Sequence, residues 1–538
     1  MGETRMSSEL RQQGEFDEYA EAAAPSRRKA TVIWGMRAFG LVAAFLVWFA
    51  MGYSEELSPD ARWVAAIGTL MAVWWMTEAI PLSVTSLLPI VLIPMLTGRS
   101  VSEATAPYGS SIVFLFLGGF LIAIAMEKWN LHRRVALHTL ARVGIEPRRI
   151  VLGMMLATGF LSMWVSNTAT TLMMLPIGLS VLTLVVEHSP TRQNAADLEA
   201  LHKGGRITDI IEDENIKRFG VCLILAIAWA ATMGGLGTLL GSPPNAIVAG
   251  YAADELGRSI GFLEWMMIGL PLALFFILIG WVLMTRVLYP FRLEEIPGGR
   301  EMIGKEIHEL GPLSQGEKMV MIVFGSAAFL WVVPGVMKTI PGLGDLLGPF
   351  GELNDTAIAI AAGTALFILP GRGRTEMVLN WKDAEDGLPW GVLLLFGGGL
   401  SLASAVAASG LDSWFGAQVV GLGVLPTILL VASITAIVLF LTEITSNTAT
   451  AATFIPVLGG VAVGIGADPL TLLIPAALAA TCAFMLPVGT PPNAIVFGTG
   501  AVTIGQMARG GFVLNIVGIM LITGFCYVLG GFALGLKF

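Results

Sequence analysis

Long apolar segments recur along almost the whole of this 538-residue chain, and they constrain its fold more than any other feature. A helix crosses the hydrocarbon core of a membrane with about 20 apolar residues. Segments of that kind follow one another from residue 34 onward, separated by polar connections. Only 13% of the residues are charged, whereas a soluble domain has roughly 25%. The sequence therefore predicts an all-α integral membrane protein.

The lengths of the apolar segments predict eleven membrane spans. They fall near residues 34–52, 62–80, 81–97, 111–128, 219–251, 262–289, 317–338, 355–371, 389–409, 469–499 and 511–535. Two further runs, 148–186 and 424–466, are too long for one span, and each has a Ser-Asn-Thr near its middle. We interpret each as a re-entrant hairpin, because non-helical backbone at membrane depth needs protein or a wet cavity around it. The alternative, that each run is two ordinary spans, stays open.

The distribution of Lys and Arg predicts the orientation, because cytoplasmic loops of membrane proteins carry an excess of both. We expect residues 1–33 to form a cytoplasmic tail, residues 34–61 to contain the first transmembrane helix, and the C-terminus to lie outside. All but five of the 31 Lys and Arg then fall in cytoplasmic segments. The exceptions are Arg62, Arg99, Arg258, Lys338 and Lys537. The expected location is the plasma membrane, the inner membrane in a bacterium.

Two motifs occur twice. Ser-Asn-Thr-Ala-Thr at 166–170 recurs at 446–450, and Gly-Ser-Pro-Pro-Asn-Ala-Ile-Val at 241–248 recurs, with Thr for Ser, at 489–496. The charged segment 187–219, which we expect to be a cytoplasmic insertion, explains why the two offsets differ. Because five spans separate equivalent points, we expect the second half, 317–538, to be inverted relative to the first, 62–289. Residues 290–316 are then a cytoplasmic linker, and inverted repeats with interrupted helices are typical of transporters.

The four motifs predict a binding site where the two repeats meet. A new helix should follow each polar break, and the N-terminus of a helix attracts anions through free N–H groups and the helix dipole. None of the four breaks has a Lys or Arg beside it, so a dianion there would need a mobile cation as well. Free carbonyls and Ser, Thr and Asn oxygens are the ligands that Na⁺ takes at such breaks. The sequence therefore predicts an anion site that is coupled to sodium.

Two acidic residues, Glu78 and Glu443, also lie within apolar runs, where an ionisable residue is by default functional. Glu443 precedes Ser446 by three residues, and its counterpart in the first repeat is Met163. We expect Glu443 to support the hairpin tip, with proton carriage as the alternative. The glycines at 118–119 and 397–399 are interpreted as close-packing positions between helices.

The doubled motifs resemble those of the divalent anion/sodium symporter family, over about residues 34–535. The resemblance implies a homodimer whose protomers each have eleven spans and two hairpins, divided into a scaffold domain and a transport domain that moves like an elevator. It also implies at least two sodium sites. The first would comprise Ser162, Ser166, Asn167 and Gly241, and the second Thr442, Thr445, Asn447 and Gly489. Substrate carboxylates would meet Asn167, Thr168, Ser242 and Pro243 on one side and Asn447, Thr448, Thr490 and Pro491 on the other.

The same resemblance implies sodium-coupled symport of C4-dicarboxylates such as succinate, malate and fumarate. A dicarboxylate exchanger and a sodium-coupled citrate or sulfate carrier are the alternatives within the family. The expected partners are the dicarboxylate, sodium ions, the lipid bilayer and a second copy of the chain. An enzyme is not expected, because the apolar segments contain no metal-ligand cluster, nucleophile–base pair or cofactor loop. No basic patch indicates a nucleic-acid partner.

Overall fold

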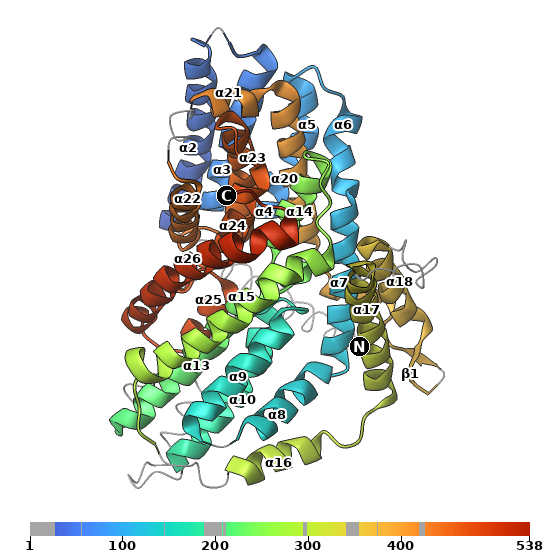
Figure 1. Cartoon of the computed structure of the whole chain (residues 1–538), viewed down its shortest axis with the longest axis vertical. Helices are drawn as coiled ribbons and strands as arrows, with labels where there is room; N and C mark the ends of the chain where they lie inside the picture. Colours follow the sequence, from blue (N-terminus) through green and yellow to red (C-terminus); the bar gives the residue numbers. More distant parts are fainter. Residues whose placement is uncertain are drawn as a thin grey trace, which may run out of the picture.

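The computed structural model describes most of the chain, and most of what it describes is helical (Figure 1). The described residues are 27–54, 56–144, 146–187, 207, 211–293, 299–339, 354–373, 375–418 and 425–538. Most of the predicted tail, most of the insertion at 187–219 and part of the linker at 290–316 lie outside them.

The helices follow one another with short connections. The first half contains α2 Arg27–Met51, α3 Pro59–Thr77, α4 Leu82–Thr85, α5 Leu88–Leu96, α6 Val101–Thr105, α7 Ser111–Lys128, α8 Leu131–Val143, α9 Pro147–Ser162, α10 Asn167–Glu187, α13 Glu214–Gly234, α14 Pro243–Asp254 and α15 Phe262–Leu283. The second contains α16 Gly299–Glu309, α17 Gln315–Thr339, α18 Asp355–Ile368, α19 Trp381–Gly387, α20 Trp390–Ser409, α21 Leu411–Gln418, α22 Thr427–Thr442, α23 Asn447–Gly464, α24 Pro469–Thr481, α25 Pro491–Gly498 and α26 Ile504–Leu534.

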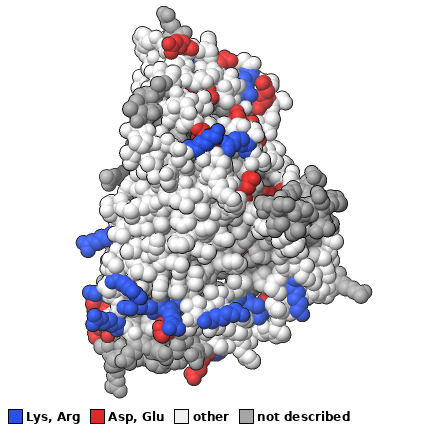
Figure 2. Space-filling model, viewed as in Figure 1, with Lys and Arg blue, Asp and Glu red and all other residues white. Residues whose placement is uncertain are grey.

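Nine helices within the described residues are long and apolar enough to cross a membrane. They are Thr31–Met51, Val101–Lys128, Asn167–Glu187, Glu214–Gly234, Phe262–Leu288, Gln315–Met337, Trp390–Ser409, Asn447–Gly464 and Ile504–Leu534. Figure 2 shows a broad middle zone with few charged side chains. Lys and Arg gather below it, at the end where Figure 1 draws α8 and α16. An uncharged zone of this kind suits the hydrocarbon core of a bilayer, and the protein is a multi-pass membrane protein.

Both long apolar runs are divided at their polar motifs, as predicted. The first is α9 followed by α10, which begins at Asn167, and the second is α22 followed by α23, which begins at Asn447. The predicted spans 219–251 and 469–499 are also interrupted, between α13 and α14 and between α24 and α25. The sequence thus located all four breaks.

Two local features differ from the predictions. The span expected at 81–97 is divided into α4 and α5, and Pro89, which lacks a backbone N–H, lies in the first turn of α5. The all-α prediction also missed an antiparallel strand pair, β1 Pro370–Arg372 and β2 Glu376–Met377. Gly373 has a φ of +61° in the connection between these strands, a conformation that glycine adopts without steric cost.

Glycines allow two pairs of segments to approach closely. A Cβ on Gly118 in α7 would overlap the backbone of Ala359 in α18, and one on Gly398 in α20 would overlap the backbone of Ser86. Gly118 and Gly398 are both buried. The interpretation of these glycines as close-packing positions is confirmed.

Replacing Gly118 by valine should lower the unfolding temperature of the purified protein in detergent, because the new side chain cannot fit against Ala359. Overpacking of a buried site costs about 1–3 kcal/mol. Gly325 in α17 provides the control, because a Cβ there meets nothing within 4 Å. Equal unfolding temperatures for Gly118→Val and Gly325→Val would contradict this account of the α7–α18 contact.

Candidate functional site

The four interrupted segments pack crosswise between the two halves. Helix α14, which follows the first Pro-Pro motif, packs against α23, which begins at the second Ser-Asn-Thr motif. Conversely, α25 of the second half packs against α10 of the first. The Thr481 hydroxyl also donates a hydrogen bond of 2.9 Å to the Ser242 hydroxyl, which joins the halves directly. Each tip helix therefore lies beside a break helix of the other half.

Asn167 organises the cluster at the first tip. Its side-chain amide forms a short hydrogen bond with the Ser162 hydroxyl. The amide atom at that end lies 3.1 Å from the Ala231 carbonyl oxygen and 3.3 Å from the Gly241 carbonyl oxygen. When the amide oxygen faces this cluster, four oxygens converge, which is the arrangement that unwound carbonyls provide for Na⁺. When the amide nitrogen faces it, the same group donates to all three neighbours.

Three of the four predicted ligands of the first sodium site, Ser162, Asn167 and Gly241, thus lie together. Ser166 has a different contact, because its hydroxyl accepts a hydrogen bond of 3.2 Å from the Ala169 N–H and caps α10. The Ala231 carbonyl was not predicted. A backbone carbonyl is present at every residue, so no side-chain pattern marks the one that faces a site.

The second tip repeats the hydroxyl–amide pair with the same spacing of five residues. The Thr442 Oγ1 lies 2.7 Å from the Asn447 Oδ1 and 2.9 Å from the Ala480 carbonyl oxygen. The Asn447 Nδ2 donates a hydrogen bond of 3.1 Å to the Thr481 carbonyl. The Thr445 hydroxyl lies 2.6 Å from the Thr450 hydroxyl and donates to the Leu441 carbonyl at 2.9 Å. The structure therefore brings Thr442 and Asn447 together, while Thr445 is engaged along its own helix.

The predicted substrate residues begin or precede the four helices at the breaks. Thr168 and Thr448 lie in the first turns of α10 and α23 and are partly exposed. Pro243 and Pro491 are the first residues of α14 and α25. Ser242 and Thr490 are buried, and the Thr490 hydroxyl caps α25 by accepting from the Asn493 N–H at 3.3 Å. The hydroxyls of Ser242 and Thr490 are thus already engaged within the protein.

The asparagine of each Pro-Pro-Asn motif holds its loop by the same two contacts. Asn245 Nδ2 donates to the carbonyls of Gly235 and Thr238, at 2.9 and 2.8 Å. Asn493 Nδ2 donates to the carbonyls ten and seven residues upstream as well, at 3.1 and 3.0 Å. Both asparagines are fully buried. The sequence analysis assigned them no role, although their duplication within the motif was the available signal.

Glu443 fixes the loop between α24 and α25 against the second tip. Its two carboxylate oxygens accept hydrogen bonds of 2.7–3.1 Å from the N–H groups of Phe484, Met485 and Leu486. The Asn515 Nδ2 donates a further bond of 2.7 Å. Bonds from N–H donors to a carboxylate are strong. These contacts match the supporting role expected for Glu443.

The first half makes the equivalent link with different chemistry. There the Thr238 hydroxyl donates to the carbonyl of Met163, the counterpart of Glu443. Gly489 lies beside the Glu443 carboxylate, because a Cβ on this glycine would be 3.2 Å from the Glu443 Oε2. In both halves, the residue three positions before the motif serine holds the neighbouring loop.

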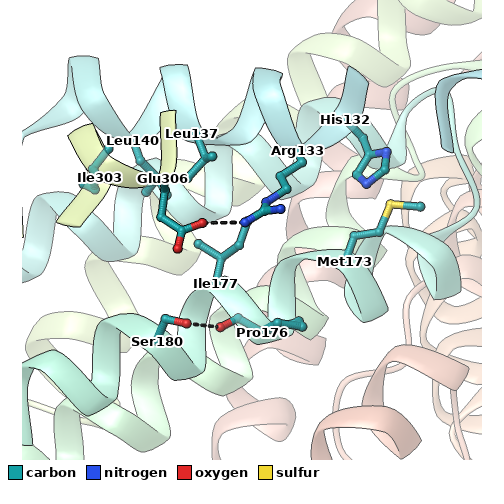
Figure 3. A pocket seen from close by; sticks show the side chains of 10 residues that line it. All are labelled: His132, Arg133, Leu137, Leu140, Met173, Pro176, Ile177, Ser180, Ile303 and Glu306. Atoms are coloured by element: carbon teal, nitrogen blue, oxygen red, sulfur yellow. Dashed lines mark hydrogen bonds and ion pairs between the residues drawn. The ribbon is translucent and has the colours of Figure 1, made fainter. Parts of the chain in front are cut away.

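A separate cavity of about 350 Å³ lies between α8, α10 and α16 (Figure 3). Arg133 of α8 and Glu306 of α16 form an ion pair of 2.5 Å at this cavity, and Met173, Pro176 and Ser180 of α10 line another side. The lining includes none of the predicted sodium or substrate residues.

Many apolar helices and polar helix breaks buried between two halves define a membrane transporter. Comparison with known proteins identifies its kind. The chain belongs to the family described as the sodium:sulfate symporter transmembrane region, whose model matches residues 33–532. Neither the family nor the relatives below are enzymes, and this protein is a transporter.

Two relatives and one solved structure are informative. The chain is 42% identical over 492 residues to the sodium-dependent dicarboxylate transporter SdcS of Staphylococcus saprophyticus, covering 90% of this chain and 89% of that protein. It is 42% identical over 494 residues to the transporter of the same name from Staphylococcus aureus strain NCTC 8325, covering 91% and 90%. The crystal structure of the Alcanivorax borkumensis YdaH transporter is similar with a TM-score of 0.51 and 14% identity, covering 80% and 86%. At that identity the likeness concerns the fold alone.

Replacing Glu443 by glutamine should lower the unfolding temperature in detergent, because an amide nitrogen would face backbone N–H groups that now meet a carboxylate oxygen. Hydrogen bonds to charged groups contribute about 1.5–3 kcal/mol, so we expect a loss of about that size. The control is Glu385→Gln in α19, where the side chain is exposed. An unfolding temperature equal to that of the control would show that the Glu443 contacts do not stabilise the loop.

Proposed function

We propose that this protein carries C4-dicarboxylates such as succinate, malate and fumarate across the membrane together with Na⁺. The observation that carries the proposal is the matched pair of hydroxyl–amide clusters, Ser162 with Asn167 and Thr442 with Asn447, at the two tips. The relatives named for sodium-dependent dicarboxylate transport support the choice of ion and substrate.

Two sodium sites follow from these clusters. The first comprises Ser162, Ser166, Asn167 and Gly241, with the Ala231 carbonyl as an additional ligand. The second comprises Thr442, Thr445, Asn447 and Gly489. No Lys or Arg occurs in the segments 163–168, 235–245, 443–448 or 482–493 that form the breaks, so sodium supplies the positive charge that a bound dianion needs.

The dicarboxylate binds between the two tips. Its carboxylates meet Asn167, Thr168, Ser242 and Pro243 at one end and Asn447, Thr448, Thr490 and Pro491 at the other. The N-termini of α10, α14, α23 and α25 add favourable dipoles for negative charge. A monocarboxylate would leave one end unpaired, and an unsatisfied buried polar group costs about 1–3 kcal/mol.

The proposed mechanism is alternating access by an elevator movement in a homodimer of protomers with eleven spans and two re-entrant hairpins. The loop contacts of Asn245 and Asn493, with identical offsets, support a division into two inverted repeats, 62–289 and 317–538. The end of the molecule where Lys and Arg gather is the cytoplasmic end (Figure 2). The N-terminus then lies in the cytoplasm and the C-terminus outside.

The proposed orientation predicts which exposed positions react with an impermeant thiol reagent. A cysteine at Lys305 in α16 should react only when the reagent reaches the cytoplasmic face, and one at Lys537 only from outside. The native cysteines are all buried, so the wild-type protein is the control for background. The opposite pattern of labelling would reverse the orientation.

The function is tested by uptake of labelled succinate into proteoliposomes. An inward Na⁺ gradient should drive accumulation above equilibrium, because the sodium clusters complete the anion site. Equal uptake with K⁺ or choline, or with a proton gradient alone, would exclude sodium coupling. Unlabelled malate should compete better than butyrate, and a clear preference for citrate or sulfate would change the substrate within the same family. Uptake that requires internal dicarboxylate would identify an exchanger.

Asn167→Ala and Asn447→Ala should each abolish sodium-driven succinate uptake, because each removes an amide proposed to contact both cation and anion. The variants should remain folded, which size-exclusion chromatography in detergent can check. Asn354→Ala is a matched control, because Asn354 only caps α18 through the Ala357 N–H. Near-normal uptake by either tip variant would contradict the site assignment.

A further inference from the structure

Glu78 has an unusual backbone conformation at the end of α3. Its φ of 48° and ψ of 37° lie in the left-handed region, and Asn130 is the other non-glycine residue with positive φ among those described. Helices often end with a left-handed residue shortly before a proline, and Pro81 follows here. The residue is usually glycine or asparagine in that position. A bulkier residue in such a strained conformation is a pointer to function.

The Glu78 side chain lines a cavity of about 360 Å³ beside the second tip. The α3–α4 connection contributes Glu78, Leu82 and Ser83, and Thr448 contributes from the start of α23. The remaining lining residues are Pro389, Gly391, Val392 and Leu395, at or near the start of α20. Glu78 is the one charged residue among these. Because Thr448 is a proposed substrate residue, the cavity adjoins the proposed substrate site.

The charge of Glu78 is not neutralised by a neighbour. Within the part of the chain that the structure describes, its carboxylate forms no hydrogen bond or ion pair, and the side chain is exposed. The nearby Arg37 is directed elsewhere, because its Nε donates to the Ala79 carbonyl at 2.9 Å and its guanidinium lies over the Trp34 ring. A fixed charge in a cleft with low-dielectric walls has its field focused into that cleft. The cavity therefore presents negative charge next to a site proposed for a dianion.

We propose that Glu78 is a charge-selecting residue at the entrance to the substrate site. Its carboxylate attracts Na⁺ into the cavity and disfavours the dicarboxylate until cations have entered. This proposal rests on the proposed sodium-coupled function. It explains why a transporter of anions keeps an unpaired acid beside its anion site, since the acid makes entry of the unaccompanied anion unfavourable.

The test compares charge-removing and charge-retaining variants in proteoliposomes. Glu78→Gln should lower the succinate concentration for half-maximal uptake at low Na⁺ by about threefold or more and raise the Na⁺ concentration for half-maximal activation. Added choline chloride should reduce the difference from wild type, because salt screens exposed charges. Glu78→Asp should resemble wild type, and so should Glu385→Gln on the exposed face of α19. A purely structural role would not produce tighter succinate binding or this dependence on salt.

The outcomes separate the two proposals. If wild-type uptake is not driven by sodium, the proposed function fails. If wild-type uptake is driven by sodium but Glu78→Gln has unchanged succinate and Na⁺ dependence, only the role of Glu78 fails. Equal defects in the Gln and Asp variants would also overturn it, because they would follow from the side chain's shape. If Glu78→Gln does not fold, Glu78→Asn replaces it, since asparagine tolerates the left-handed backbone and removes the charge.

Discussion

The need to satisfy backbone polar groups inside a membrane controls this structure. Lipid cannot bond a free N–H or C=O, so an interrupted helix is stable only where protein or a wet cavity satisfies its ends. Four interruptions occur here, and specific side chains support their loops. Asn245 and Asn493 each hold two carbonyls, and Glu443 accepts three consecutive N–H groups. These residues keep the remaining polar groups at the breaks in place.

The polar groups left over at each tip are a hydroxyl and an amide with carbonyls beside them. At the first tip the neighbours are Ala231 and Gly241, and at the second they are Ala480 and Thr481. Such a set is electrically neutral. It can interact with a cation through its oxygens, but it supplies no net charge to hold a dianion, whereas the adjacent helix N-termini favour negative charge. Cation and anion therefore need each other at this site.

The sequence predicted the parts of this arrangement that have a local signature. Apolar length marked the membrane helices, polar motifs marked the breaks, and the doubled Ser-Asn-Thr marked Asn167 and Asn447. It did not reveal the Ala231 carbonyl, because backbone atoms carry no residue code, or the crosswise packing of α14 on α23 and α25 on α10, because such contacts depend on the folded arrangement. Glu78 was recognised only as an acid in an apolar run. Its left-handed backbone and the cavity it shares with Thr448 required coordinates.

Duplication has preserved the geometry of the two tips without preserving their electrostatics. The link between Thr238 and the Met163 carbonyl is made by neutral groups, whereas the equivalent link in the second half contains the Glu443 carboxylate next to Gly489. Glu78 adds another carboxylate beside Thr448 of the same tip. Because the field near a site depends on every charge around it, the second tip is the more electronegative of the two. The motifs alone suggest two equivalent ends for a symmetric dicarboxylate, but the residues around them make those ends unequal.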